Sequence, residues 1–71
     1  MDPYQELANG IVKSAVIDYR RALKAIKKNM HAYDAERTVK ECEMFFRSQW
    51  FSILTEVNGN WLIERLQKEF T

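Results

Sequence analysis

Residues 45–54 read FFRSQWFSIL, and this stretch decides the fold because three Phe and one Trp fall within seven positions. If one helix runs through it unbroken, Phe45 and Phe51 point away from the apolar stripe. If Ser48 ends one helix and caps the next, the aromatic residues and Leu54 can all face inward: Phe45, Phe46, Trp50, Phe51 and Leu54. Serine is a favourable N-cap, and two exposed Phe side chains would forfeit about 1.5–3 kcal/mol of burial each. The sequence therefore favours a bend near Ser48.

The length and composition indicate one small domain, residues 1–71. The chain has 71 residues, a net charge of +1, and is 46% hydrophobic and 13% aromatic. A chain of this length buries only about 60% of its unfolded surface and is marginally stable alone. Its single cysteine, Cys42, cannot form an intrachain disulfide, and one Cys with one His cannot supply the four ligands of a structural zinc site. We therefore expect no metal and no cofactor, and stabilisation as a homo-oligomer, with a dimer as the default.

The sequence also indicates where the chain resides. No apolar run approaches the roughly 20 residues that a membrane-spanning helix needs. The first residues, Met1-Asp2-Pro3, lack the basic and apolar regions of a signal peptide. A lone cysteine is typical of a reducing compartment. We expect a cytoplasmic protein without membrane contact.

The spacing of apolar residues predicts an all-α fold, a small bundle of three to four helices. A long first helix over about residues 3–28 starts with Asp2 as N-cap and Pro3 in the first turn, and its apolar positions alternate four and three apart from Val12 to Met30. A second helix over about residues 34–56, with Asp34 as its cap, bends or breaks near Ser48. The Asn-Gly pair at 58–59 then starts a short C-terminal helix over about residues 59–70, which packs across the hairpin of the first two.

Gly10 lies inside the predicted first helix, where a glycine costs about 1 kcal/mol relative to alanine. Two interpretations remain open. In the first, which we favour, the first turn frays at Asn9-Gly10. In the second, another backbone approaches closely at this point.

The first helix carries six basic residues, most of which lie on a face beside the apolar one: Lys13, Arg20, Arg21, Lys24, Lys27 and Lys28. They are candidate ligands for the phosphates of nucleic acid or a nucleotide, since each neutralised phosphate adds a salt-dependent increment to affinity. A solvated helix face is the competing interpretation, because no recognised nucleic-acid-binding motif accompanies the basic residues. The acids of the second helix could also face them across the hairpin. Ile17, set among the basic residues, hints at a protein contact.

No residue pattern indicates catalysis, so we expect no catalytic residues and no enzyme. His31 has neither a carboxylate pair nor a cysteine nucleophile beside it in the sequence. Cys42 falls on the apolar stripe of the second helix, where a small buried hydrophobic residue is expected, and a nucleophile would need a base beside it. Glu41 and Glu43 are two residues apart and point to different sides of a helix.

The aromatic residues are too numerous for a domain of this size to hide completely. Trp and Tyr are enriched where interfaces carry their energy. We expect a cluster drawn from Phe45, Trp50, Phe51 and Trp61 to remain partly exposed. With two charged neighbours, the predicted partner-binding residues are Phe45, Arg47, Trp50, Phe51, Trp61 and Arg65.

Two segments carry a resemblance to a known family: DYRRALKAIKKN (18–29) and ECEMFFRSQWFSILTEVNGNWLIERLQKE (41–69). They resemble a set of small proteins encoded by prophages and integrative elements of Gram-positive bacteria, over about residues 7–69, most distinctively in FFRSQWF and NGNWLIERL. The family pattern has Asp-Gly in place of Asn58-Gly59, and a proline at Met30. Its members have no established activity, so the resemblance implies no catalytic residues. It implies the setting of short accessory genes of mobile elements, whose products often bind a host protein, and in some cases nucleotide signals or DNA.

The sequence thus leads to a functional expectation with two alternatives. We expect a non-enzymatic accessory protein of a phage or mobile element that acts by protein–protein contact and inhibits or modulates a host defence factor. The first alternative is a small nucleic-acid- or nucleotide-binding protein that uses the basic residues of the first helix. The second is a structural subunit whose only partner is itself.

Overall fold

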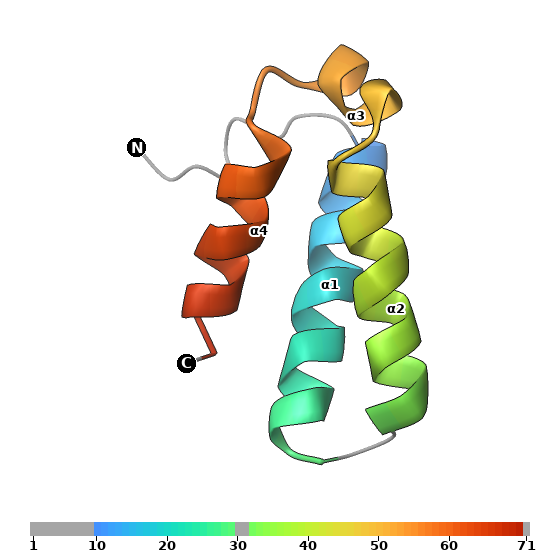
Figure 1. The fold of residues 1–71 in the computed structure, drawn as a ribbon, viewed down its shortest axis with the longest axis vertical. Coiled ribbons are helices and arrows are strands. Elements are labelled where there is room, and N and C mark those ends of the chain that lie inside the picture. The colour runs from blue at the N-terminus through green and yellow to red at the C-terminus, as the bar shows by residue number, and fades with distance from the viewer. Residues whose placement is uncertain (1–9, 30–31, 71) are drawn as a thin grey trace.

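The computed structural model describes residues 10–29 and 32–70, and these form four α-helices. Their bounds are α1 Gly10–Lys27, α2 Ala32–Phe46, α3 Gln49–Leu54 and α4 Gly59–Lys68. α1 and α2 lie side by side as an antiparallel hairpin, α3 sits at the end where α1 begins, and α4 runs alongside the hairpin (Figure 1). The predicted all-α bundle is confirmed. The predicted start of the first helix, at Asp2 and Pro3, lies outside the described residues.

The first helix ends where the sequence predicts. Asn29 takes the left-handed conformation with φ 55°, and its amide donates to the carbonyl of Ile26 at 3.0 Å. This conformation ends helices because it turns the chain away from the helix axis, and Asn tolerates it better than most residues.

Ser48 breaks the second helix, as predicted. Its hydroxyl donates to the carbonyl of Phe45 at 2.6 Å and accepts from the amide of Phe51 at 3.2 Å, so one side chain closes α2 and caps α3. The predicted ends of this region were less accurate. α2 begins two residues before Asp34, which therefore lies in the first turn instead of capping the helix. α3 ends at Leu54, two residues earlier than expected, because Thr55 is extended.

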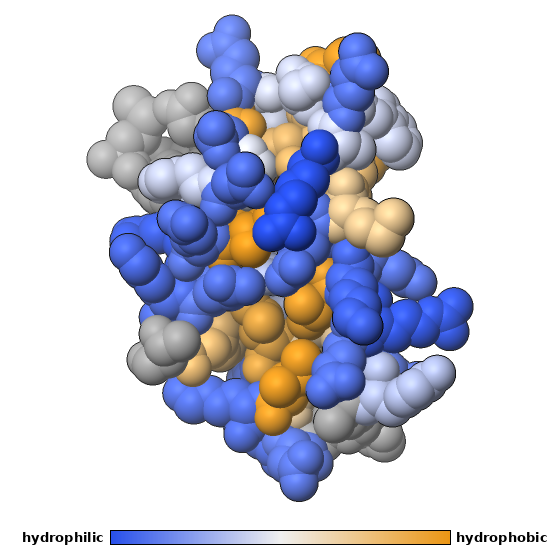
Figure 2. Space-filling view, viewed as in Figure 1, coloured by the Kyte–Doolittle hydropathy of each residue, from blue (hydrophilic) through white to orange (hydrophobic). Residues whose placement is uncertain are grey.

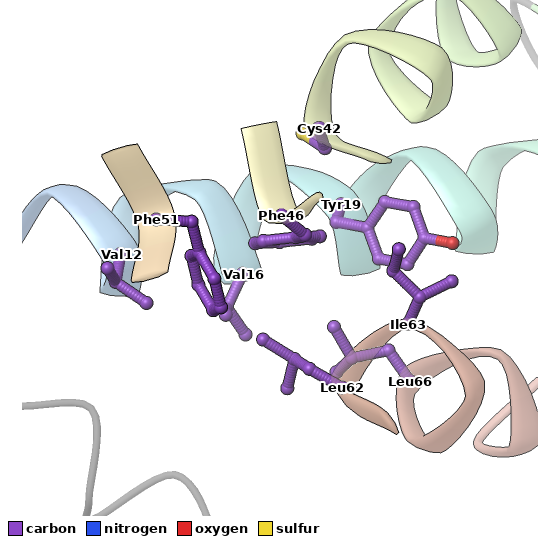
Figure 3. Packing of buried hydrophobic residues seen from close by; sticks show 9 residues of the cluster. All are labelled: Val12, Val16, Tyr19, Cys42, Phe46, Phe51, Leu62, Ile63 and Leu66. Carbon is purple, nitrogen blue, oxygen red and sulfur yellow. The ribbon is translucent and has the colours of Figure 1, made fainter. Parts of the chain in front are cut away.

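The core lies where α1, α2, α3 and α4 meet. Rings of Tyr19 and Phe46 meet edge to face with centroids 5.6 Å apart, and Phe46 and Phe51 do the same at 5.5 Å. Apolar side chains of α4 close the cluster from the other side (Figure 3). The residues of the cluster are Val12, Val16, Tyr19, Cys42, Phe46, Phe51, Leu62, Ile63 and Leu66.

A side-chain cap defines the start of α4. Asn58 caps it as predicted, its side-chain oxygen accepting from the amide of Trp61 at 3.0 Å.

α4 has 10 residues and α1 has 18, so α4 covers only part of the hairpin. Hydrophobic side chains accordingly show between hydrophilic ones along the middle of the face seen in Figure 2. Leu23 and Val39 of the hairpin remain only partly buried for this reason.

The two glycines have different roles. Gly59 has no left-handed φ, but a methyl group built on it would overlap the carbonyl oxygen of Phe46. Here the glycine allows α4 to start against the end of α2. Among residues 10–29 and 32–70, nothing lies within 4 Å of a methyl group built on Gly10, so no described backbone approaches this glycine closely.

Gly59→Ala should lower the free energy of unfolding by about 1–3 kcal/mol, because the backbone at Phe46 must shift to admit the methyl group. The matched control is Gly10→Ala, which should raise it by about 0.4–1 kcal/mol by restricting the unfolded chain. Urea unfolding followed by far-ultraviolet circular dichroism measures both. Equal effects of the two substitutions would contradict the proposed packing of α4.

Candidate interaction surface

α3 presents two large apolar side chains to solvent. Trp50 is 53% exposed and Ile53 is 75% exposed, whereas Phe51 is only 1% exposed. Successive residues of a helix point about 100° apart, so the cap at Ser48 turns Phe51 into the core and Trp50 away from it. The expectation that Trp50 turns inward at the bend was therefore wrong.

Phe45 connects this exposed surface to the core. Its half-buried ring meets Trp50 edge to face with centroids 5.8 Å apart, and meets Phe51 in the same way at 5.6 Å. Edge-to-face pairs contribute about 0.5–1.5 kcal/mol beyond their burial. Trp50 is thus held in place by Phe45 while about half of its surface stays exposed. We call Phe45, Trp50 and Ile53 the α3 surface.

The structure does not bring the six predicted partner-binding residues together on one surface. Phe51 was wrongly included, because it is buried beneath the α3 surface. Arg47 is exposed but held, its guanidinium donating to Asn60 at 3.1 Å and lying 3.6 Å from Glu43. Trp61, 45% exposed, and the exposed Arg65 lie on α4, a different helix from Trp50.

Ile53 belongs to this exposed face but is not among the residues predicted from the sequence to bind a partner. In an unbroken helix, Ile53 would continue the apolar stripe of the second helix, and no separate role would be expected for it. Once Ser48 is taken as the break, Ile53 falls three residues after Trp50 and shares its face of α3. This spacing is the same with or without the break, so the missing signal was which face of α3 turns away from the core.

The basic residues of α1 and its end are all exposed: Lys13, Arg20, Arg21, Lys24, Lys27 and Lys28. Ile17 among them is 49% exposed. Arg20 forms an ion pair at 3.0 Å with Glu69, which directly follows α4. Among the acids of α2, Asp34 and Glu41 line a groove together with Arg21. The acids of α2 thus approach one edge of the basic face, and Glu69 engages Arg20.

A polar network joins three helices beside the core. The hydroxyl of Tyr19 donates to Oε2 of Glu43 at 2.8 Å, and the amide nitrogen of Gln67 donates to the same hydroxyl at 3.2 Å. Burial raises the pKa of Tyr19 above its usual value of 10, and the hydrogen bond to Glu43 raises it further. The network therefore holds the phenol in its neutral form.

Cys42 is buried among apolar residues, as the sequence predicts. Its thiol donates a weak hydrogen bond to the carbonyl of Ala15 at 3.7 Å. Burial raises the pKa of the thiol to about 11, which suppresses the reactive thiolate near neutral pH. His31 lies outside the described residues. Within residues 10–29 and 32–70, no three His, Cys, Asp or Glu side chains are grouped to hold a metal ion.

None of the described helices combines the length and apolarity needed to cross a membrane. Comparison of the chain with protein-family models, curated proteins and solved structures found no match. The geometry of the chain's own residues therefore carries the functional argument.

Tyr19→Phe should lower stability at neutral pH by about 1 kcal/mol, because Glu43 and Gln67 lose a shared partner. The substitution should also change how the free energy of unfolding falls as the pH rises into the alkaline range. The pKa of Tyr19 is higher in the folded than in the unfolded chain, so its contribution is complete below about pH 10 and declines as the pH rises further.

Urea unfolding of both chains from neutral pH into the alkaline range tests this. The wild type should lose stability more steeply above about pH 10 than Tyr19→Phe. Cys42 is present in both chains, so its own titration cancels in the difference. Parallel curves for the two proteins would show that the Tyr19 hydroxyl is not held as described.

Proposed function

We propose that this chain is a non-enzymatic interaction protein that binds a partner protein through the α3 surface. The observation that carries the proposal is the exposure of Trp50 and Ile53 side by side, with Trp50 positioned by Phe45. Interface energy concentrates in a few large side chains, Trp foremost, that are held in place before binding. Arg47 lies two residues after Phe45 and is hydrogen-bonded to Asn60, so it adds a positive charge beside these apolar side chains.

We also propose a biological setting, which rests only on the sequence resemblance of residues 18–29 and 41–69 to accessory proteins of prophages and integrative elements. In that setting the partner is a host protein of the bacterial cytoplasm. The action proposed is inhibition or modulation of a host defence factor by occupying its surface. Trp61 and Arg65 of α4 extend the proposed contact if the partner reaches beyond α3.

The proposal assigns no covalent chemistry to the chain. The one cysteine is buried, and its raised pKa disfavours the thiolate that a nucleophile requires. The groove between α1 and α2 is lined by three acids, Asp18, Asp34 and Glu41. This groove is open to solvent and does not enclose a substrate. Contact, not catalysis, is the use that these residues support.

Replacement of Trp50 by Ala should abolish partner binding without unfolding the chain, since half of this side chain lies outside the core. The measurement is affinity capture from the lysate of a Gram-positive host, with the wild type and Trp50→Ala as baits and quantification by mass spectrometry. A specific partner should fall at least about tenfold with the variant, as expected for an interface hot spot.

The matched control is Tyr33→Ala, because Tyr33 is an 82% exposed aromatic residue on α2, away from the α3 surface. This control should capture the partner as the wild type does. Circular dichroism must show that all three baits are folded. Equal capture by Trp50→Ala and wild type would refute the α3 surface as the binding site.

A second function, binding of nucleic acid or a nucleotide, is favoured by one observation. α1 and its end carry six exposed basic residues against a single acid, Asp18, although the whole chain has a net charge of only +1. Arg20 is engaged by Glu69, so Lys13 and Lys24 are better positions to test than Arg20. In this alternative, Lys13→Glu with Lys24→Glu weakens binding to a fluorescent single-stranded oligonucleotide and flattens its salt dependence, whereas Trp50→Ala leaves both unchanged.

A further inference from the structure

Two Asn-Gly pairs occur in the chain, at residues 9–10 and 58–59, and the second pair begins α4. Asn-Gly sequences are prone to deamidation, because glycine has no side chain to hinder attack by its own amide nitrogen on the preceding side chain. Asn58 is exposed and lines a pocket, open to solvent, that residues of α3 and the start of α4 share. Water therefore has access to the side-chain amide of Asn58.

The packing of α4 uses both residues of this pair. A methyl group on Gly59 would overlap the carbonyl oxygen of Phe46, so a larger residue fits here only if the backbone shifts. Asn58 supplies the side-chain oxygen that accepts from the amide of Trp61 and caps the helix. The chemically labile pair is thus also the point at which α4 is fitted to the end of α2.

The folded geometry of Asn58 opposes deamidation. The reaction begins when the amide nitrogen of Gly59 attacks Cγ of Asn58, which requires rotation about the Cα–C bond until this nitrogen lies beside Cβ. At the observed ψ of 123° the nitrogen is turned away from Cβ. Both oxygens of Asn58 also accept from α4, the side-chain oxygen from the amide of Trp61 and the carbonyl from the amide of Leu62, each at 3.0 Å. The reaction therefore requires the first turn of α4 to unwind.

We propose that Asn58-Gly59 is a deamidation site that the docking of α4 protects, and that its isoaspartate product prevents α4 from docking again. When α4 detaches, the amide nitrogen of Gly59 gives its proton to water, bonds to Cγ of Asn58 and expels the side-chain nitrogen as ammonia. Water then adds to either carbonyl of the cyclic imide and opens the ring to aspartate or isoaspartate. The sum of the steps converts an amide and water into a carboxylate and ammonium, without oxidation or reduction.

The two products have opposite effects on α4. Aspartate at position 58 keeps a side-chain oxygen for capping, and its negative charge is favourable at a helix N-terminus. Isoaspartate brings the former Cβ into the main chain and so lengthens the connection before Gly59, which then loses its fit against the carbonyl of Phe46. It also turns the carbonyl that accepted from Leu62 into a free carboxylate outside the main chain. The isoaspartate chain therefore loses both the cap and the fit of α4.

The first test compares the rate of deamidation of the full chain when folded and in urea, in one mildly alkaline buffer at constant temperature. Tryptic digestion places Asn58 in the peptide of residues 48–65 and Asn9 in the peptide of residues 1–13, so mass spectrometry follows each pair separately. In urea the two pairs should react at similar rates. In the folded chain Asn58 should react at least about tenfold more slowly than in urea, because only the fraction with α4 open reacts.

Leu66→Ala tests whether α4 is the protecting element, since Leu66 is a fully buried residue of this helix outside the Asn-Gly pair. It should raise the rate at Asn58 in the folded chain at least about fivefold, towards the rate in urea, and leave the rate in urea unchanged. If circular dichroism shows that Leu66→Ala does not fold, Ile63→Val replaces it, with an expected rise of about twofold or more. The matched control is Glu64→Ala at an exposed position of α4, which should change neither rate by more than about twofold.

The second test measures the effect of the product. Because Cys42 is the single cysteine, the chain can be joined by ligation of residues 1–41 to a synthetic peptide of residues 42–71 that carries isoaspartate at position 58. The reference is Asn58→Asp, which has the same composition and charge with a normal backbone. The isoaspartate chain should show a folding equilibrium constant at least about tenfold smaller than this reference in urea unfolding, since it lacks the cap and the fit of α4.

Three results would overturn the proposal. Equal rates at Asn58 in the folded chain and in urea would show that folding does not protect the pair. A folded Leu66→Ala chain that is less stable than the wild type but deamidates no faster would show that the protection does not come from α4. An isoaspartate chain as stable as Asn58→Asp would show that the product does not prevent docking.

Discussion

The two hydrogen bonds of the Ser48 hydroxyl are the constraint on which the rest of the structure depends. By donating to Phe45 and accepting from Phe51, this one side chain ends α2 and starts α3 in a new direction. The consequence is a division of the aromatic residues: Phe46 and Phe51 enter the core and Trp50 remains outside. The end of α2 also leaves the carbonyl of Phe46 where Gly59 can approach it, and so fixes where α4 begins.

The core and the proposed surface are therefore parts of one arrangement. Phe45 touches Phe46 and Phe51 on one side and Trp50 on the other, so the buried rings support the exposed one. The network of Tyr19, Glu43 and Gln67 fixes α4 to both helices of the hairpin and limits rearrangement beneath α3. A partner would thus meet a surface that needs little ordering on binding, which reduces the entropic cost of association.

Features encoded by neighbouring residues were predictable from the sequence. The apolar spacing of α1, the caps at Ser48 and Asn58, the left-handed Asn29 and the burial of Cys42 all depend on local signals. Features that depend on how helices meet were not. The direction of a six-residue helix after a sharp bend decides that Phe51 is buried and Trp50 and Ile53 are exposed. In the same way, the ion pair of Arg20 with Glu69 can be predicted only when it is known which side of α1 packs against α4.

The central claim is that the break at Ser48 places Phe51 inside and its neighbour Trp50 outside. The most direct measurement is the free energy of unfolding of Phe51→Ala and Trp50→Ala in urea. The account predicts a loss of about 3–5 kcal/mol for Phe51→Ala and at most about 1 kcal/mol for Trp50→Ala. If Phe51→Ala does not fold, Phe51→Leu and Trp50→Leu give the same comparison at smaller cost. Equal losses at the two positions, or a larger loss at Trp50, would contradict it.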